Sequence, residues 1–186
     1  MPRGSSATET ILFRTRVSGP VGELVAYARP GALCALSFAG GRYDPLAGLR
    51  ARFGALRIED GDPLGLRGTF EAYFRGALTA LDALAVDTGG TPFQRRVWSI
   101  LRTIPPGRTA SYIEVARRAD APDAVRAVGA ANGANPVAIV VPCHRVIGAD
   151  GSLVGYGGGL DRKRWLLAHE RAPVGAAGAV QGRLFE

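Results

Sequence analysis

Residues 111–132, SYIEVARRADAPDAVRAVGAAN, hold the pattern that decides the fold of the second half of the chain. Ser111 and Glu114 have the Ser-x-x-Glu spacing of a capping box, which predicts that a helix begins here. Residues 120–122 connect it to a further helix that begins near Asp123. Two short helices with a join of three or four residues match a helix-turn-helix, although many helical domains contain the same corner.

The segments on either side carry further helix signals. TPFQ at 91–94 predicts a helix start, with Thr as N-cap, Pro at the first helical position and Gln closing a capping box. PPG at 105–107 ends that helix. After the second helix of the pair, NGANP at 132–136 breaks the helical pattern, and the apolar run VAIVV leads to Cys143. Asp161 is expected to cap a last helix, RKRWLLAHE.

The first half of the chain has a different character. Short apolar runs separated by Gly-Pro turns predict strands at 11–17, 23–28 and 32–38. Residues 44–62 look irregular, and apolar residues at helical spacing predict a helix over 64–82. These elements indicate a small α/β unit.

The predicted fold class is therefore α+β. A small N-terminal α/β domain occupies residues 1–88. A mostly helical C-terminal domain with the helix-turn-helix occupies residues 89–172, and residues 173–186 are expected to form a flexible tail.

Composition limits the classes of protein that fit. The chain has 186 residues, of which 47% are hydrophobic and 21% charged, as in an ordinary globular protein. The N-terminal stretch has no apolar signal region, and no run of about 18 apolar residues appears, so we expect a cytoplasmic protein without a membrane partner. The net charge is +7, and residues 89–170 supply 11 cations against 6 acids. This local excess predicts a polyanion partner, although a genome that prefers arginine codons would produce the same bias; Lys163 is the only lysine.

The two cysteines have different surroundings. Cys34 lies inside a predicted strand, where a small buried hydrophobe is expected. Without a secretory signal, two reduced thiols are expected in place of a disulfide. The two histidines, His144 and His169, lack the spacing of a zinc pair, so no metal site is predicted.

The stretch VVPCHRV, residues 140–146, is where reactive chemistry is expected. A thiol with its usual pKa of about 8.5 is mostly protonated at neutral pH, and a nearby base or cation would supply thiolate. Neighbouring side chains in an extended segment point apart, so a water between Cys143 and His144 is easier than direct contact. Glu170 on the last helix could orient the histidine. A buried structural thiol beside a plain glycine loop, GYGGG, is the alternative.

Five motifs follow one another over residues 89–170: GTPFQRRVW, IPPGRTASY, RAVGAANGANP, VVPCHRVIGADG and GYGGGLDRKRWLLAHE. In their order and spacings they resemble one known family, the methylated-DNA–protein-cysteine methyltransferases, also called O6-alkylguanine-DNA alkyltransferases. The preceding residues resemble the family's more variable N-terminal domain, which implies an RNase H-like α/β fold. The resemblance implies DNA repair by one irreversible transfer of an alkyl group from guanine O6, and less readily from thymine O4, to the protein's own cysteine. No cofactor is implied.

The resemblance assigns catalytic roles to residues of this chain. Cys143 would accept the alkyl group, His144 would be the water-linked base, and Glu170 would orient it. Tyr112 would protonate the leaving guanine and crowd the phosphate of the target nucleotide. Asn135 would hold the turn between the recognition helix and the cysteine segment.

The same resemblance assigns a DNA surface and a pocket. Arg126 would enter the base stack in place of the flipped nucleotide. The small residues of its helix would sit in the minor groove of double-stranded DNA. The helix residues expected at DNA, besides Tyr112 and Arg126, are Ala127, Gly129 and Ala130. The carbonyls of Cys143 and Val146 would read the guanine amino group, and Tyr156, Gly157 and Gly158 would line the pocket. The protein would bind DNA as a monomer and could coat it cooperatively.

Three other functions compete with this interpretation. A non-catalytic damage binder of the same fold would lack the reactive cysteine, whereas Cys143 is intact. A cysteine hydrolase would need turnover and an oxyanion hole, and a plain helix-turn-helix transcription factor would leave VVPCHRV and GYGGG unexplained. Two departures from the family pattern are Ile113, where small residues are common, and an N-terminal half without the cysteines and histidines of a zinc site.

Overall fold

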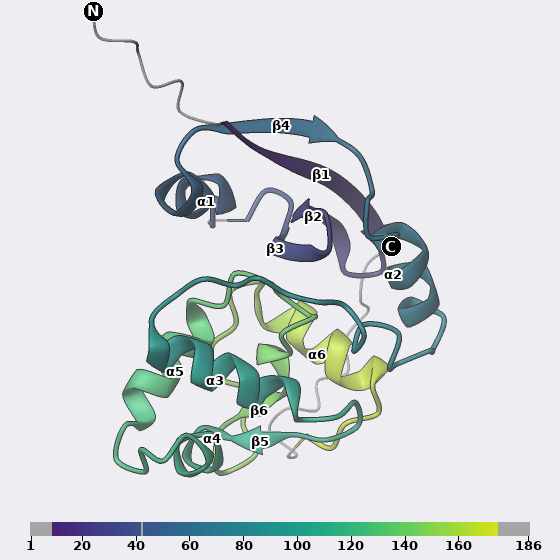
Figure 1. The fold of residues 1–186 in the computed structure, drawn as a ribbon. Coiled ribbons are helices and arrows are strands. Elements are labelled where there is room, and N and C mark those ends of the chain that lie inside the picture. The colour runs from purple at the N-terminus through teal and green to yellow at the C-terminus, as the bar shows by residue number, and fades with distance from the viewer. Residues whose placement is uncertain (1–8, 42, 175–186) are drawn as a thin grey trace, which may run out of the picture.

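The computed structural model describes residues 9–41 and 43–174, and the expected flexible tail lies almost wholly outside these residues. A four-stranded sheet with two helices forms the N-terminal half, and the C-terminal half is mostly helical (Figure 1). The elements are β1 (Thr10–Gly19), β2 (Gly22–Arg29), β3 (Ala32–Phe38), α1 (Pro45–Phe53), β4 (Leu56–Asp60), α2 (Leu66–Phe74), α3 (Pro92–Arg102), β5 (Ala110–Ser111), α4 (Tyr112–Arg118), α5 (Val125–Gly133), a 3₁₀ turn (Cys143–Arg145), β6 (Val146–Ile147) and α6 (Leu160–His169). The expected α+β class is confirmed.

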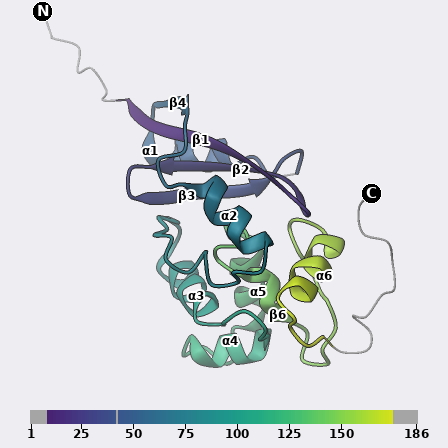
Figure 2. The same cartoon turned by 90° about the vertical axis from the view of Figure 1, so that its right-hand side faces the viewer.

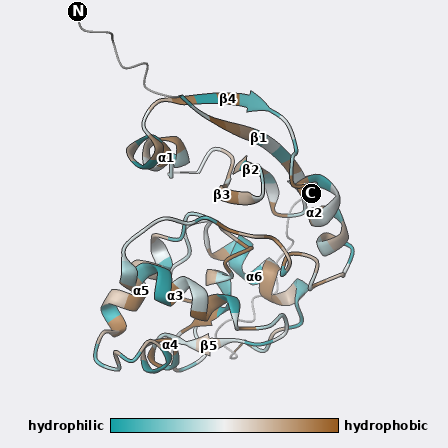
Figure 3. Ribbon diagram, in the orientation of Figure 1, coloured by the Kyte–Doolittle hydropathy of each residue, from teal (hydrophilic) through white to brown (hydrophobic). Residues whose placement is uncertain are grey.

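The sheet has the strand order β3-β2-β1-β4. Strands β1, β2 and β3 form an antiparallel meander at the three predicted positions, and β4 joins β1 in parallel. Helix α1 covers one face of the sheet through a core cluster that contains Leu12, Cys34 and Leu49. Figure 2 shows α2 between the sheet and the C-terminal half. The edge strand β4 is largely hydrophilic, whereas β1 carries hydrophobic stretches (Figure 3).

Two predictions for the first half were wrong. Residues 44–62, expected to be irregular, contain α1 and β4. Asp44 caps α1 by accepting a hydrogen bond from the backbone N–H of Leu46, and Pro45 occupies the first turn. The helix predicted over 64–82 is α2 alone, because Gly76 adopts a φ of +105° and the chain continues in tight turns. The apolar residues past Phe74, such as Leu78, pack against the main core from these turns and not from a helix.

Helices α3, α4 and α5 pack against one another in the C-terminal half. Both predicted capping boxes are present, at Thr91–Gln94 and at Ser111–Glu114. The prediction that Asp161 caps the last helix was wrong. Helix α6 begins at Leu160 without a side-chain cap, and the Asp161 carboxylate pairs with Arg164 at 2.6 Å.

The two halves are joined along the free edge of β3. The N–H of Leu36 donates to the carbonyl of Pro136 at 2.9 Å, and the N–H of Ala138 donates to the carbonyl of Leu36 at 3.0 Å. Leu33, also in β3, bonds the segment that connects α2 to α3: its N–H donates to the carbonyl of Ala85 at 2.9 Å. A β edge that would otherwise be open is thus covered by the segment that leads to Cys143.

That segment, VAIVV, folds as a series of tight turns. The N–H of Val140 donates to the carbonyl of Ala138 and that of Val141 to Val137, at 2.8 and 3.0 Å. Ile139 has a φ of +67°, a strained conformation for a β-branched residue, and is buried. The cysteine segment was expected to be extended, but it forms a 3₁₀ turn. In the part of the chain described, no helix has both the length and the apolar content to cross a membrane.

Candidate active site

Cys143 begins the 3₁₀ turn and is 6% exposed. The side-chain amide of Asn135 donates to its sulfur at 3.1 Å and to the carbonyl of Val141 at 2.7 Å. The amide oxygen of Asn135 accepts from the N–H of Val137 at 3.0 Å. One side chain therefore fixes the tight turns and presents an N–H to the thiol.

Two opposing influences act on the thiol. Burial raises the pKa of Cys143, whereas the hydrogen bond from Asn135 and the charge of Lys163 act to lower it. A cation near the thiol, as expected, and an amide donor that was not predicted are therefore present, but burial outweighs them in the resting site. Formation of thiolate then requires a base that takes the proton.

His144 follows Cys143 in the same 3₁₀ turn. Its ring is fully buried, and Nε2 lies 3.0 Å from Oε1 of Glu170. Burial lowers the pKa of His144, even though Glu170 acts to raise it, so the ring is neutral near pH 7. A neutral ring facing a carboxylate must carry its proton on Nε2 and donate it to Glu170. Nδ1 has no hydrogen-bond partner among the described residues and keeps a lone pair that can accept a proton.

Arg145 balances the charge of Glu170, a role that its place in the sequence did not indicate. Its Nε and one terminal nitrogen each donate to Glu170 at 2.8 Å, in the two-pronged geometry that suits a carboxylate. Its other terminal nitrogen donates to the carbonyl of Ile104. Burial alone would raise the pKa of Glu170, but the hydrogen bonds and charges of His144 and Arg145 hold it well below its usual range.

Lys163 is a second residue whose role was missed. Its ammonium is buried and donates to the carbonyls of Val146 and Val154, each at 2.7 Å. Burial lowers the pKa of Lys163 to about 8. It ties the segment after the cysteine to the glycine loop. One signal in the sequence could have revealed this role: Lys163 is the one lysine in an arginine-rich chain. An ammonium is a compact point charge that several carbonyls can surround, whereas a guanidinium is planar.

A cavity of about 90 Å³ adjoins Cys143 and is lined by both halves of the chain. Tyr156, Gly157 and Gly158 line it, as expected, together with Phe38 at the end of β3. Phe38 packs edge-on against Tyr156, with ring centroids 6.1 Å apart. A Cβ at Gly158 would lie 2.4 Å from the Phe38 ring, so glycine is required there. The predicted pocket residue Val146 lies outside this lining, and its carbonyl bonds Lys163.

Two buried polar atoms line this cavity region. The hydroxyl of Tyr156 and the amide oxygen of Asn132 have no hydrogen-bond partner within residues 9–41 and 43–174. Buried polar groups are normally satisfied, and these two oxygens beside the buried thiol can accept hydrogen bonds from a molecule in the cavity.

Tyr112 and Arg126 lie together on an outer surface. With Ile113, Val125, Gly129 and Ala149 they line an open depression of about 400 Å³. Arg126, Ala127 and Ala130 are exposed on α5. The parallel pairing of β5 with β6 aligns Ser111 with Ile147, which holds Tyr112 near the cysteine turn. Burial raises the pKa of Tyr112, so its hydroxyl stays protonated at neutral pH.

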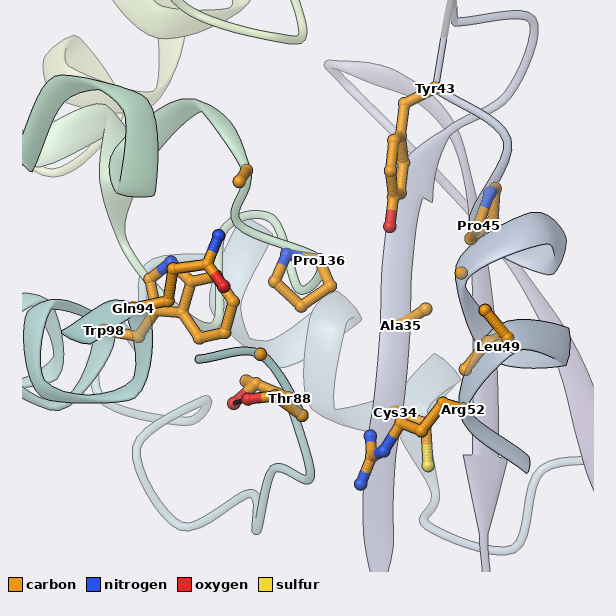
Figure 4. A pocket seen from close by; sticks show the side chains of 15 residues that line it. Cys34, Ala35, Tyr43, Pro45, Leu49, Arg52, Thr88, Gln94, Trp98 and Pro136 are labelled. Carbon is orange, nitrogen blue, oxygen red and sulfur yellow. Dashed lines mark hydrogen bonds between the residues drawn. The ribbon is translucent and has the colours of Figure 1, made fainter. Parts of the chain in front are cut away.

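A larger cavity, of about 520 Å³, lies between α1 and the start of α3. In Figure 4, Pro45, Leu49 and Arg52 form one wall, and Gln94, Trp98 and Pro136 face them across β3. Cys34 is buried here, as expected, and is a free thiol. None of the predicted site residues lines this cavity. Among the described residues, no three His, Cys, Asp or Glu side chains gather closely enough to hold a metal ion.

Comparisons with known proteins agree on one family. Residues 92–172 match the DNA-binding domain of 6-O-methylguanine DNA methyltransferase. A methylated-DNA–protein-cysteine methyltransferase of Mycolicibacterium paratuberculosis is 50% identical over 164 residues, covering 87% of this chain and 93% of the relative. One from Shigella flexneri is 55% identical over 114 residues, covering 61% and 67%. The crystal structure of Mycobacterium tuberculosis OGT in complex with DNA superposes with a TM-score of 0.72 at 42% identity, covering 87% of this chain and 95% of that one.

The hydrogen bond from Asn135 to the sulfur acts to lower the pKa of the Cys143 thiol. Asn135→Ala, made in a Cys34→Ala background so that only Cys143 reports, should raise the pKa of the thiol. A hydrogen bond to a charged group contributes about 1.5–3 kcal/mol, which corresponds to a rise of about 1–2 pH units in the midpoint of the reaction with iodoacetamide.

The matched control is Asn132→Ala. The amide of Asn132 lies 3.5 Å from the carbonyl of Cys143 and does not bond the sulfur. An unshifted midpoint in Asn135→Ala, or equal shifts in both variants, would contradict the assigned contact.

Proposed function

This chain belongs to the methylated-DNA–protein-cysteine methyltransferase family, and on that premise we propose that Cys143 is the residue that receives the alkyl group. The chain is thus a DNA-repair methyltransferase, as its motifs predicted. The observation that carries the assignment to Cys143 is the meeting of three features: a buried thiol, an amide N–H on its sulfur, and a neutral histidine with a free ring nitrogen.

The transfer proceeds in one displacement. A water molecule carries the thiol proton of Cys143 to Nδ1 of His144, and Glu170 stabilises the imidazolium that forms. The sulfur attacks the alkyl carbon, the carbon–O6 bond breaks, and its electron pair stays with guanine. Tyr112 gives one proton to the departing guanine. His144 has meanwhile gained one proton from the thiol, so the protein and the guanine together hold as many protons as before. Asn135 holds the sulfur in line through the amide contact.

The substrate is double-stranded DNA with an alkylated base, as expected for a relative of a protein solved in complex with DNA. Helices α4 and α5 act as a helix-turn-helix, with α5 in the minor groove. The exposed small residues Ala127 and Ala130 support this, because they permit close approach to the groove walls. The excess of cations over acids in residues 89–170 supplies contacts to phosphates that do not depend on sequence.

The damaged base is read after it leaves the stack. Arg126 occupies the gap, which offsets part of the few kcal/mol that flipping costs. The carbonyls of Cys143 and Val146 accept from the guanine amino group, and Val146 retains a second lone pair beside its bond to Lys163. Tyr156 and the amide of Gly157 meet O6, with Gly158 in the wall. O6-alkylguanine is preferred to O4-alkylthymine.

The reaction consumes the protein, because the thioether on Cys143 is stable and no described residue is placed to remove the alkyl group. Each molecule acts once, as a cytoplasmic monomer that can also coat DNA, and no cofactor takes part. The N-terminal domain predicted over residues 1–88 is RNase H-like in its described part, which the order β3-β2-β1-β4 supports, and residues 89–172 form the DNA-binding and catalytic domain.

Intact mass and peptide mapping test the assignment directly. Mixing the protein with a duplex that carries one O6-methylguanine should add one methyl group, on Cys143, and the gain should saturate at one per molecule. Cys34→Ala should behave like the wild type, and Cys143→Ser should bind the duplex without any gain. Binding without transfer by the wild type would favour a damage sensor, and continued turnover would favour a hydrolase.

Arg126→Ala tests whether the Arg126 side chain fills the gap that a flipped base leaves in the stack. Because the arginine acts only when a base is flipped, its loss should slow repair of duplex DNA about tenfold to a hundredfold. Reaction with free O6-benzylguanine should stay within about twofold. Arg117→Ala, an exposed arginine of α4, serves as the control for simple loss of charge. If Arg126→Ala slowed the reaction equally with duplex DNA and with free O6-benzylguanine, this role of Arg126 would be rejected.

A further inference from the structure

Tyr73, a residue of the N-terminal half, reaches the proton relay of the C-terminal half. It lies near the end of α2, and its side chain is fully buried. Its hydroxyl donates to Oε1 of Glu170 at 2.7 Å, across 97 positions of sequence. This is the same carboxylate oxygen that accepts from Nε2 of His144 at 3.0 Å.

The contact is held in place from several sides. The backbone carbonyl of Tyr73 accepts a hydrogen bond from Nε2 of His169 at 2.8 Å, so α2 and the end of α6 are joined twice. The Tyr73 ring also packs edge-on against Phe70, Phe74 and His169, at centroid distances of 6.5, 5.4 and 5.1 Å. A ring fixed in this way can aim its hydroxyl at one atom only.

Glu170 needs such a donor because of where it lies. It follows the last residue of α6, where the helix dipole is negative and disfavours a carboxylate. It is also buried, so its charge depends on hydrogen bonds within the protein. The groups that face it are Tyr73 from α2 and both His144 and Arg145 from the 3₁₀ turn, and Lys163 of α6 adds positive charge near His144.

We propose that Tyr73 is a positioning residue for the alkyl transfer: its hydroxyl fixes the Glu170 carboxylate so that Oε1 stays aligned on Nε2 of a neutral His144. This inference rests on the proposed function of Cys143 and His144. It makes the N-terminal half a part of the catalytic apparatus, in addition to its support of the β3 edge. Burial and the neighbouring carboxylate raise the pKa of Tyr73, which keeps its hydroxyl protonated and able to donate.

Tyr73→Phe removes the hydroxyl and keeps the ring. Transfer from free O6-benzylguanine to Cys143, followed by intact mass, should slow about tenfold near pH 7. The fall in rate at low pH should begin at a higher pH, because a carboxylate with one donor fewer holds the proton of His144 more tightly. Tyr27→Phe is the matched control, since Tyr27 is buried under α1 in the other core cluster. It should leave both the rate and the pH profile unchanged.

A second pair of variants separates positioning from mere packing. In a His144→Gln background the base is gone, so Tyr73→Phe should change the remaining rate by less than about twofold. The same loss in both backgrounds, or an unshifted pH profile in Tyr73→Phe, would overturn the proposal. Transfer by the wild type in the same assay keeps the two claims apart: if the wild type gains no mass on Cys143, the proposed function fails instead.

Discussion

The buried carboxylate of Glu170 is the group on which the rest of the site depends. It lies at the unfavourable end of α6 and is cut off from water, so only protein donors can stabilise its charge. Arg145 supplies two N–H groups, Tyr73 a hydroxyl and His144 a ring N–H. The bond from His144 decides its tautomer, and in the proposed transfer this tautomer leaves Nδ1 free to take the thiol proton. Removing one partner of a buried ion pair lowers the stability of the fold by far more than the pair itself adds to it, because the remaining charge is left buried without a partner.

The N-terminal half meets the site at three places. It contributes Tyr73 to the carboxylate, Phe38 to the wall of the cavity, and the edge of β3 to the turns before Cys143. Ile139 is strained in those turns, and strain of this kind persists only when the surrounding structure holds it. A reactive thiol is thus fixed between two halves, neither of which contains the whole site.

The sequence could predict what local chemistry determines. The capping boxes at Ser111 and Thr91 and the three strands of the meander follow from spacing within a few residues, and Cys143 with His144 was visible as a pair. Strand β4 was missed because its pairing with β1 is parallel and distant in sequence. The roles of Arg145, Lys163 and Tyr73 were missed for a similar reason: each depends on a partner 9 to 97 positions away, at Glu170, Val154 or Val146. The wrong cap at Asp161 arose because Arg164 binds its carboxylate instead.

The proposed proton transfer from Cys143 requires one tautomer of His144. Nitrogen-15 NMR of histidine-labelled protein, with His169→Gln to assign the two rings, reports which ring nitrogen carries the proton. We expect a neutral ring from pH 6.5 to 8, protonated at Nε2 and bare at Nδ1. Lowering the pH should charge His144 only below the range of a free histidine, because burial lowers its pKa. A proton on Nδ1, or an imidazolium at pH 7, would contradict the relay from Cys143 to His144.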